Sequence, residues 1–169
     1  MILVTVGNDL PFSRLVEHAD SWAKAHPAEP MLAQTGRLRN SDYVPKAMEW
    51  VEMLPAEQFE HRCGEAKLIV AHAGMGSIIT ALSAGKPIVI LPRMARLKEH
   101  RSDHQLATAR RFDGRPGVFV AWTEAGLADA IERALTAPRA AETLPRFAPA
   151  EFTDRLREFI LHGRRPPRQ

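Results

Sequence analysis

A glycine turn between two apolar runs is the part of this sequence most suited to chemistry. Gly74, Gly76 and Ser77 follow the apolar run 68–71 and precede the pattern of a short helix. Backbone N–H groups at a helix start and the helix dipole both favour an anion, and glycine lets a phosphate approach the backbone. Ser77 could cap the helix or donate to a phosphate oxygen. The glycines could equally serve only to make a tight turn, so the turn alone leaves anion binding open.

Several common kinds of site do not fit this turn. It lacks the full G-x-G-x-x-G pattern, and no Gly-Lys-Ser/Thr follows as in a P-loop. The sequence has no G-x-S-x-G elbow, which disfavours a serine hydrolase. The expected second strand ends in Gln34 and not in an acidic residue, which disfavours a dinucleotide-dependent oxidoreductase. His72, just before the turn, could contact a ligand or be a satisfied histidine at a strand end.

A strand–helix–strand unit holds the turn in place. The runs 68–71 and 88–91 are apolar throughout, which suits parallel strands covered on both faces. Gly85 can end the intervening helix, and Pro87 cannot continue it. In such a unit the glycine turn lies at the carboxyl end of the first strand. This is also the amino end of the helix, where an anion is favoured.

Strands and helices alternate along the rest of the chain. We expect strands at 1–6, 31–34, 47–53, 68–71, 88–91 and 117–121, and further helices at 12–26, 55–63, 104–112, 124–135 and 152–162. The alternation predicts the α/β class, with a Rossmann-like, doubly wound parallel sheet of about six strands. Ligands of such sheets bind at the carboxyl ends of the strands. The turns at Gly7, Gly36 and Gly74 would therefore share one edge.

The composition is that of an ordinary globular protein. The 169 residues are 45% hydrophobic and 25% charged, which fits a single domain over residues 1–162 and a disordered basic tail over 163–169. The net charge of +3 suits anionic ligands or an anionic membrane surface, but no nucleic-acid motif accompanies it. Cys63 is the only cysteine, so no internal disulfide is possible, and a structural thiol is expected. We find neither a membrane-spanning run nor a leader peptide, and expect a cytoplasmic protein.

A basic segment at 93–103 would face the same edge. Arg93 and Arg101 could clamp a diphosphate or a sugar carboxylate, because the guanidinium fork matches such groups. A solvated loop is the equal alternative. Because few apolar residues, Met94 and Leu97, could anchor the loop 93–101, we expect it to be mobile without ligand and to order over the ligand. His100, Asp103 and His104 could suggest a metal site, but nothing nearby completes a ligand set and we expect no metal.

Several short motifs, taken together, resemble a known family. They are VTVG at 4–7, QTG at 34–36, IVAHAGMGS at 69–77, GKP at 85–87 and DHQ at 103–105. In this order they resemble the C-terminal, donor-binding domain of family 28 glycosyltransferases. The nearer likeness is to the single-domain small subunits of split enzymes. These include bacterial exopolysaccharide glycosyltransferases and the eukaryotic enzyme that adds the second N-acetylglucosamine to dolichol diphosphate.

The resemblance implies one half of a GT-B fold that binds a UDP-sugar as donor substrate without a further cofactor. The sugar, possibly glucuronate by likeness to exopolysaccharide relatives, would pass to a polyprenyl-diphosphate-linked acceptor. A separate, membrane-attached subunit would supply the acceptor site and the catalytic base, so no base is assigned here. The chain would then lie in the cytoplasm, peripheral at the inner face of the membrane through its partner. The alternative is a non-catalytic nucleotide-sugar-binding or regulatory module.

The resemblance also assigns donor-binding positions. They are Gly7, Asn8, Gly36, His72, Gly74, Met75, Gly76, Ser77, Thr80, Arg93, His104 and Gln105. Within this set His104 and Gln105 match the contact with the donor sugar, and the turn at 74–77 matches the main diphosphate contact. Thr80 is a departure, because the family commonly has at this position a glutamate that binds the ribose hydroxyls. Another residue would then have to assist in ribose recognition.

Overall fold

The protein is built on a parallel sheet of six strands, in the order β3-β2-β1-β4-β5-β6. The computed structural model describes residues 1–8, 10–138 and 147–163. The strands are β1 (Ile2–Thr5), β2 (Met31–Gln34), β3 (Glu49–Val51), β4 (Leu68–His72), β5 (Ile88–Leu91) and β6 (Val118–Val120). Because β1 pairs with both β2 and β4, the strand order reverses between β1 and β4. The predicted α/β, doubly wound class and its six strands are confirmed.

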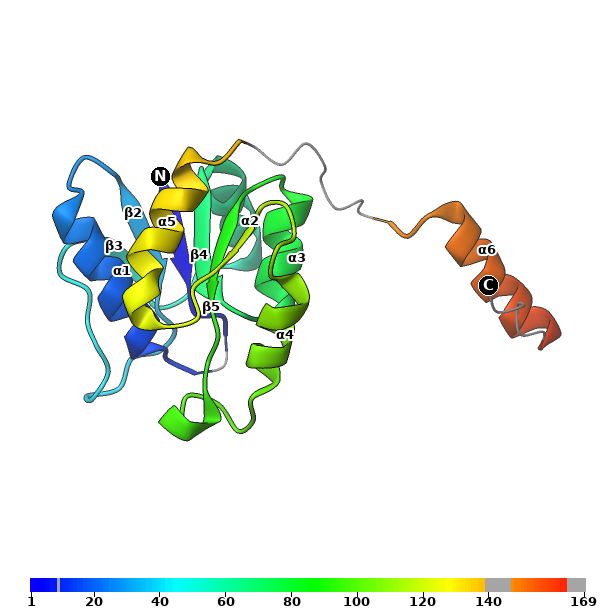
Figure 1. Cartoon of the computed structure of the whole chain (residues 1–169), viewed down its shortest axis with the longest axis horizontal. Helices are drawn as coiled ribbons and strands as arrows, with labels where there is room; N and C mark the ends of the chain where they lie inside the picture. Colours follow the sequence, from blue (N-terminus) through cyan, green and yellow to red (C-terminus); the bar gives the residue numbers. More distant parts are fainter. Residues whose placement is uncertain (9, 139–146, 164–169) are drawn as a thin grey trace.

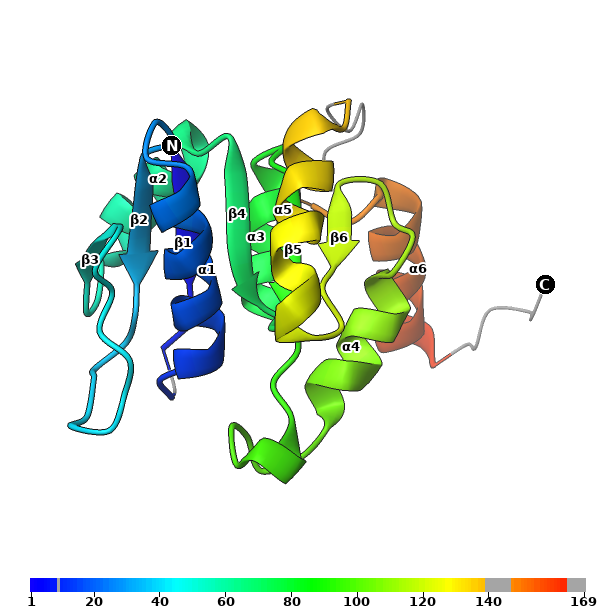
Figure 2. The same ribbon diagram turned by 60° about the vertical axis from the view of Figure 1, so that its left-hand side comes forward.

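Helices cover both faces of this sheet, as Figures 1 and 2 show. They are α1 (Ser13–Ala25), α2 (Ala56–Glu65), α3 (Met75–Ser83), α4 (His104–Phe112), α5 (Leu127–Thr136) and α6 (Ala150–His162), with short 3-10 helices η1 (Ala95–Leu97) and η2 (Glu124–Gly126). Helices α1 and α5 lie on one face, while α2, α3 and α4 lie on the other. The expected helices are present, with ends shifted by a few residues.

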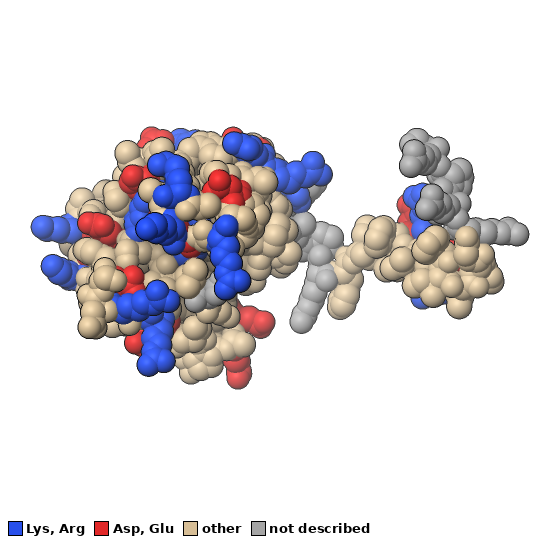
Figure 3. Space-filling model, turned by 90° about the horizontal axis from the view of Figure 1, so that it is seen from below, with Lys and Arg blue, Asp and Glu red and all other residues tan. Residues whose placement is uncertain are grey.

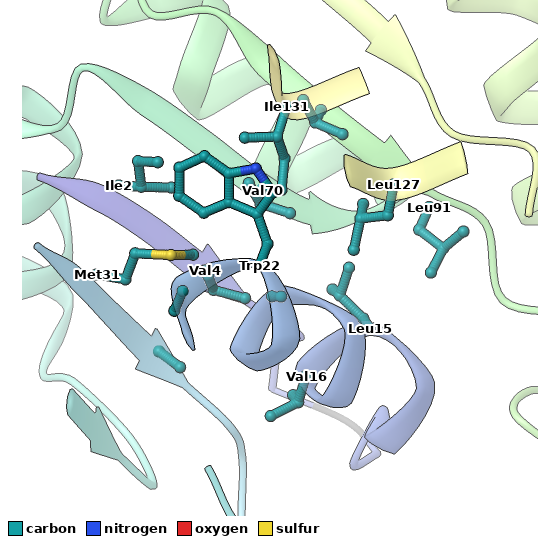
Figure 4. Close-up of a cluster of buried hydrophobic side chains, with 14 of the residues drawn as sticks. Ile2, Val4, Leu15, Val16, Trp22, Met31, Val70, Leu91, Leu127 and Ile131 are labelled. Carbon is teal, nitrogen blue, oxygen red and sulfur yellow. The ribbon is translucent and has the colours of Figure 1, made fainter. Parts of the chain in front are cut away.

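Alternate residues of the central strands enter two different cores. Ile2 and Val4 pack with Leu15 and Trp22 beneath α1 and α5 (Figure 4). Leu3 points the other way and joins the core beneath α2, α3 and α4. Every residue of β1 and β5 is buried, which explains why these strands are apolar throughout and do not alternate.

The third strand is shorter than the sequence predicts, and a buried carboxylate explains the difference. We expected a strand over 47–53, but β3 begins only at Glu49. The carboxylate of Asp20 accepts hydrogen bonds from the backbone N–H groups of Lys46, Ala47 and Met48 at 2.8–3.1 Å. These donors are therefore engaged away from β2. Burial raises the pKa of Asp20, but these bonds, together with one from the hydroxyl of Tyr43, outweigh it and lower that pKa below its usual value.

The helix after the glycine turn starts earlier than the position of Ser77 suggested. Gly74 is its N-cap residue, and no side chain caps the helix. Ser77 therefore lies inside the first turn, so its expected capping role is wrong. The other end agrees with the prediction, because Gly85 follows the helix with a φ of +65°.

Helix α6 differs from the rest of the fold because none of its residues is buried. Figure 1 shows it apart from the sheet and the other helices. That residues 1–162 form a single domain therefore stays a prediction for α6. Of the expected basic tail, residues 164–169 lie outside the described residues.

Candidate functional site

A cleft of about 470 Å³ opens where the strand order reverses, at the carboxyl edge of the sheet. Its lining comes from the ends of β1, β2 and β4 and the first turns of α2 and α3: Thr5, Gly7, Asn8, Gln34, Leu54, Ala56, Phe59, Glu60, His72, Gly76, Ser77 and Thr80. Doubly wound sheets bind their ligands at this place. A smaller hollow of about 230 Å³ lies near the opposite edge, beside Met1 and Pro30, and contains none of the predicted site residues.

Two glycines enclose the ring of His72 at the floor of the cleft. A Cβ atom at Gly74 would lie 2.1 Å from Nε2 of His72, and one at Gly7 would lie 2.7 Å from Cε1. Gly7 also has a φ of +80°, a conformation that favours glycine. Both positions therefore exclude a side chain because the imidazole fills the space. The sequence suggested a tight turn as one reason for glycine, and the contact with the ring of His72 is an additional reason.

Glycine at position 76 has a different effect from glycine at positions 7 and 74. A Cβ atom there would meet no protein atom within 4 Å, so the space beside it is open to the cleft. Gly76 and Ser77 belong to the first turn of α3, where backbone N–H groups have no acceptor within the helix. The helix dipole adds partial positive charge at the same point. The predicted geometry for an anion is therefore present.

His72 is held in its neutral form near pH 7. Burial lowers the pKa of this histidine to about 4, and the positive charge of Arg93 acts in the same direction. Its Nδ1 atom is buried and has no hydrogen-bond partner among the described residues. A neutral imidazole offers one donor and one acceptor, so His72 can contribute a hydrogen bond to a ligand but no full charge.

At the end of β2, Gln34 lines the cleft and Gly36 does not. The Oε1 atom of Gln34 accepts a hydrogen bond from the backbone N–H of Leu54 at 3.0 Å, which fixes the turn between β3 and α2 against the cleft. Gly36 follows with a φ of +69° but does not line the cleft. The half-exposed side chain of Met75 lies outside the lining as well.

Arg93 is not the exposed clamp that the sequence suggested. Its side chain is only 2% exposed, and its guanidinium donates to the carbonyl oxygens of Val6 at 3.0 Å and Pro11 at 2.8 Å. It also donates to the carbonyl of Leu10 and stacks over Phe12, 4.5 Å from the ring centre. Arg93 therefore joins the end of β5 to the turn after β1. Its contribution to the site is to hold that turn in position.

The segment after Arg93 is anchored by carboxylates. Glu99 pairs with Arg14 at 2.6 Å and accepts a hydrogen bond from the backbone N–H of Met94 at 2.9 Å. Burial lowers the pKa of Arg14, but its bonds to Glu99 and Glu124 outweigh that effect and raise it above the usual value. Polar contacts therefore anchor this loop, and that it is mobile without ligand and orders over the donor stays a prediction.

The two residues matched to the donor sugar have different surroundings. Gln105 is buried, and its Oε1 atom accepts a hydrogen bond from the backbone N–H of Arg93 at 3.1 Å. His104 is exposed, and its ring meets that of His100 edge-on at 4.4 Å. Neither residue lines the cleft. Across the described ranges, no group of three or more histidine, cysteine or acidic side chains is arranged to hold a metal ion.

The charges around this edge are mixed. Figure 3 looks onto the lower side of the molecule, where lysine and arginine side chains are separated by aspartate and glutamate and form no continuous basic band. Cys63 is buried and does not line the cleft: burial raises the pKa of its thiol to about 11, with the charge of Glu60 acting in the same direction. This agrees with the structural role expected for it.

The sequence reasoning missed the wall that α2 contributes to the cleft. Ala56, Phe59 and Glu60 line it, yet the segment was treated only as a helix. Their spacing of three and four residues places them on one side of an α-helix. That spacing, at the amino end of a helix that follows a strand, was the signal available.

The fold is that of a Rossmann-like domain, and its cleft lies at the reversal of strand order, where such domains bind ligands. Residues 1–154 match the family described as the glycosyltransferase family 28 C-terminal domain. The chain therefore belongs to this family, and the resemblance drawn from its motifs is confirmed. A comparison with curated proteins found no match.

Three solved structures that superpose on this chain are glycosyltransferases of the GT-B type. A glycotransferase of kitacinnamycin superposes with a TM-score of 0.63 at 22% identity, over 81% of this chain and 35% of its own. A UDP-glucose:anthocyanidin 3-O-glucosyltransferase, solved in complex with UDP, gives 0.59 at 17% identity, over 82% and 32%. The calicheamicin glycosyltransferase CalG4 gives 0.53 at 18%, over 80% and 34%. The chain thus spans about a third of each, and corresponds to one half of the GT-B fold.

Within the described residues, no helix has both the length and the apolar character required to cross a bilayer.

Proposed function

We propose that this chain binds the UDP-sugar donor of a glycosyltransferase in the cleft between β1 and β4. One observation carries the proposal: in a member of family 28, the cleft at the strand reversal combines the open first turn of α3 with the enclosed His72. The diphosphate would lie against Gly76 and Ser77, where free N–H groups and the helix dipole stabilise negative charge. UDP departs as an anion, so the same groups would stabilise it as it leaves.

The reaction we propose is sugar transfer to a polyprenyl-diphosphate-linked acceptor in exopolysaccharide synthesis. Such a transfer needs a base to activate the acceptor hydroxyl. His72 is a poor candidate, because it is enclosed beneath the donor site. We therefore assign the base and the acceptor site to a membrane-attached partner subunit, which would hold this chain at the cytoplasmic face of the membrane.

Helix α6 supports the proposal of a partner. Phe152, Leu156, Phe159 and Ile160 recur with helical spacing along it, and each is at least 45% exposed. An apolar stripe of this kind on an otherwise charged helix is typical of a surface that another protein covers. The occupant we propose is the acceptor-binding subunit.

The proposal that the sugar is glucuronate rests on Arg101. Glucuronate was favoured by the arginine-rich loop, but Arg93 is committed to backbone carbonyls. Arg101 is exposed and stays available. Binding of UDP-glucose and UDP-glucuronate should be compared with and without Arg101→Ala. A selective loss of UDP-glucuronate affinity would support the uronic acid, and equal losses would place the arginine on the diphosphate.

A binding module without activity is the second candidate, and Thr80 favours it. Transfer to a lipid-linked acceptor should be measured for this chain alone and for this chain added to membranes that carry the partner. We expect almost no transfer by the chain alone and clear transfer with the partner. Efficient transfer by the purified chain would contradict the split enzyme. UDP binding without transfer in either case would favour the module.

A further inference from the structure

Two helix starts face each other across the cleft. Ala56, Phe59 and Glu60 come from the first turns of α2, and Ser77 and Thr80 from those of α3. The spacing within each set is that of residues on one side of a helix. Both helices follow parallel strands, so both begin at the carboxyl edge of the sheet.

The two walls differ in chemistry. The α3 wall has the open glycine turn and suits an anion. The α2 wall brings Leu54 and Phe59, which offer an apolar surface, together with the carboxylate of Glu60. Of the described residues that line the cleft, Glu60 alone is acidic. A carboxylate repels a diphosphate, so a ligand of the cleft must place its anionic part near α3 and its hydroxyl groups or base near α2.

Glu60 is also uncommitted. It has no ion-pair or hydrogen-bond partner in the part of the chain that the structure describes, whereas the next carboxylate on α2, Glu65, pairs with Arg62 at 3.1 Å. An unpaired carboxylate can accept hydrogen bonds from two neighbouring hydroxyl groups at once. A ribose carries such a pair in its 2′ and 3′ hydroxyls.

We infer that Glu60 binds the ribose hydroxyls of the donor nucleotide across the cleft from Thr80. The inference rests on the proposed function, since it assumes a nucleoside diphosphate in this cleft. Glu60 would supply from α2 the carboxylate that position 80 of α3 lacks, because a threonine stands there. Glu60 would then make the site selective for ribonucleotides over deoxyribonucleotides, while Phe59 and Leu54 lie beside the base.

The test is a comparison of UDP with 2′-deoxy-UDP by isothermal titration calorimetry. The proteins are the unaltered chain, Glu60→Gln, Glu60→Ala and the control Glu57→Gln. Glu57 lies on the same helix and is exposed, but it does not line the cleft. The ratio of the two dissociation constants is the readout, because it cancels any general effect of removing a negative charge near a diphosphate.

We expect the unaltered chain and Glu57→Gln to bind UDP about tenfold more tightly than 2′-deoxy-UDP, as for one charge-assisted hydrogen bond. In Glu60→Ala the ratio should fall to about one, and in Glu60→Gln to an intermediate value. A ratio near one in the unaltered chain, or an unchanged ratio in Glu60→Ala, would overturn the role of Glu60 while leaving the donor site intact. If the unaltered chain bound neither nucleotide, the proposed function itself would fail.

Discussion

Two segments leave neighbouring strands at the same edge of the sheet, and they obtain their shape in different ways. The turn after β4 depends on its own backbone: glycine at 74, free N–H groups at 75–77 and a helix that starts at once. The segment after β5 depends on distant partners. Arg93 and Glu99 bind residues 82 to 87 positions away along the sequence.

This difference distinguishes a candidate ligand site, the turn after β4, from a segment that supports it, the one after β5. The turn after β4 leaves groups open to the cleft, while the segment after β5 uses its charges inside the protein. Positive charge near a predicted phosphate site is therefore not enough to assign a contact. An arginine that reaches several backbone carbonyls is occupied, however close it lies to the ligand.

The largest expected effect is on stability, from Arg93→Ala. Removing the guanidinium leaves the carbonyls of Val6, Leu10 and Pro11 without this donor, and we expect a loss of about 3 kcal/mol in the free energy of unfolding. Urea denaturation measures it. Arg101→Ala, at an exposed position, is the control and should change stability by less than about 0.5 kcal/mol.

Arg93→Ala also tests whether Arg93 contacts the ligand. If Arg93→Ala kept full stability but lost affinity for UDP, Arg93 would be a ligand contact after all. Arg93→Lys sharpens the test, since a single ammonium cannot reach the same separated carbonyls and should recover little of the loss.

Next in size is Glu99→Gln, which weakens the anchor of the second segment. Its partner Arg14 would remain in a place where its side chain is only 11% exposed, and the bond to Met94 N–H would weaken. We expect a loss of about 2 kcal/mol in unfolding free energy. Glu124→Gln, whose side chain is 43% exposed, should cost clearly less. Equal costs for the two variants would show that burial of the pair contributes little.

Gly74→Ala and Gly76→Ala form a matched pair for the turn after β4. A Cβ atom at Gly74 must displace the ring of His72, whereas one at Gly76 meets no protein atom. Both proteins should fold, as near-native circular dichroism would show. We expect UDP affinity to fall at least tenfold in Gly74→Ala, roughly 1.4 kcal/mol. Unchanged affinity in a folded Gly74→Ala would remove the diphosphate from this turn.

A loss of affinity in Gly76→Ala would add information of its own. Since no protein atom would be crowded, the loss would come from the ligand itself, and would place the phosphate against that backbone. Unchanged affinity would restrict the anion to the neighbourhood of Gly74 and His72.

The smallest effect concerns pH. The pKa of His72 is lowered to about 4 in the folded chain, against an ordinary value of 6.5. Between these values the unfolded chain binds a proton that the folded chain does not, so stability falls as pH falls from 6.5 towards 4. At pH 6 the cost is about 0.8 kcal/mol. Unfolding of His72→Gln measured from pH 7.5 to 5 should show a flatter profile, and an unchanged slope would contradict the shift.

The sequence was sufficient for features that are determined within a few residues. Gly74, Gly85 and Pro87 set the limits of a strand, a turn and a helix by their backbone chemistry alone. The apolar runs then predicted a parallel sheet, and the place of the cleft followed from its winding. The motifs shared with family 28 added the class of protein.

The remaining features depend on contacts that spacing does not reveal. From the sequence, Arg93 is expected to lie at the surface. Its partners are the backbone carbonyls near Val6, and no sequence pattern indicates that these would accept hydrogen bonds from an arginine. Asp20 shortens β3 through a loop 26 to 28 residues away. Glu60 joins the cleft only because α2 and α3 start side by side. In each case tertiary packing determined the role of a polar side chain.

The hydrogen bonds donated by Arg93 also bear on the order in which contacts form during folding. Strand β1 pairs with β4 across more than sixty positions, and Arg93 must then reach the turn that follows β1. Such distant contacts form late in folding. On the ribosome, the cleft cannot be complete until the chain up to Arg93 has emerged. A bound nucleotide should accordingly slow the unfolding of the finished domain while leaving its rate of folding almost unchanged.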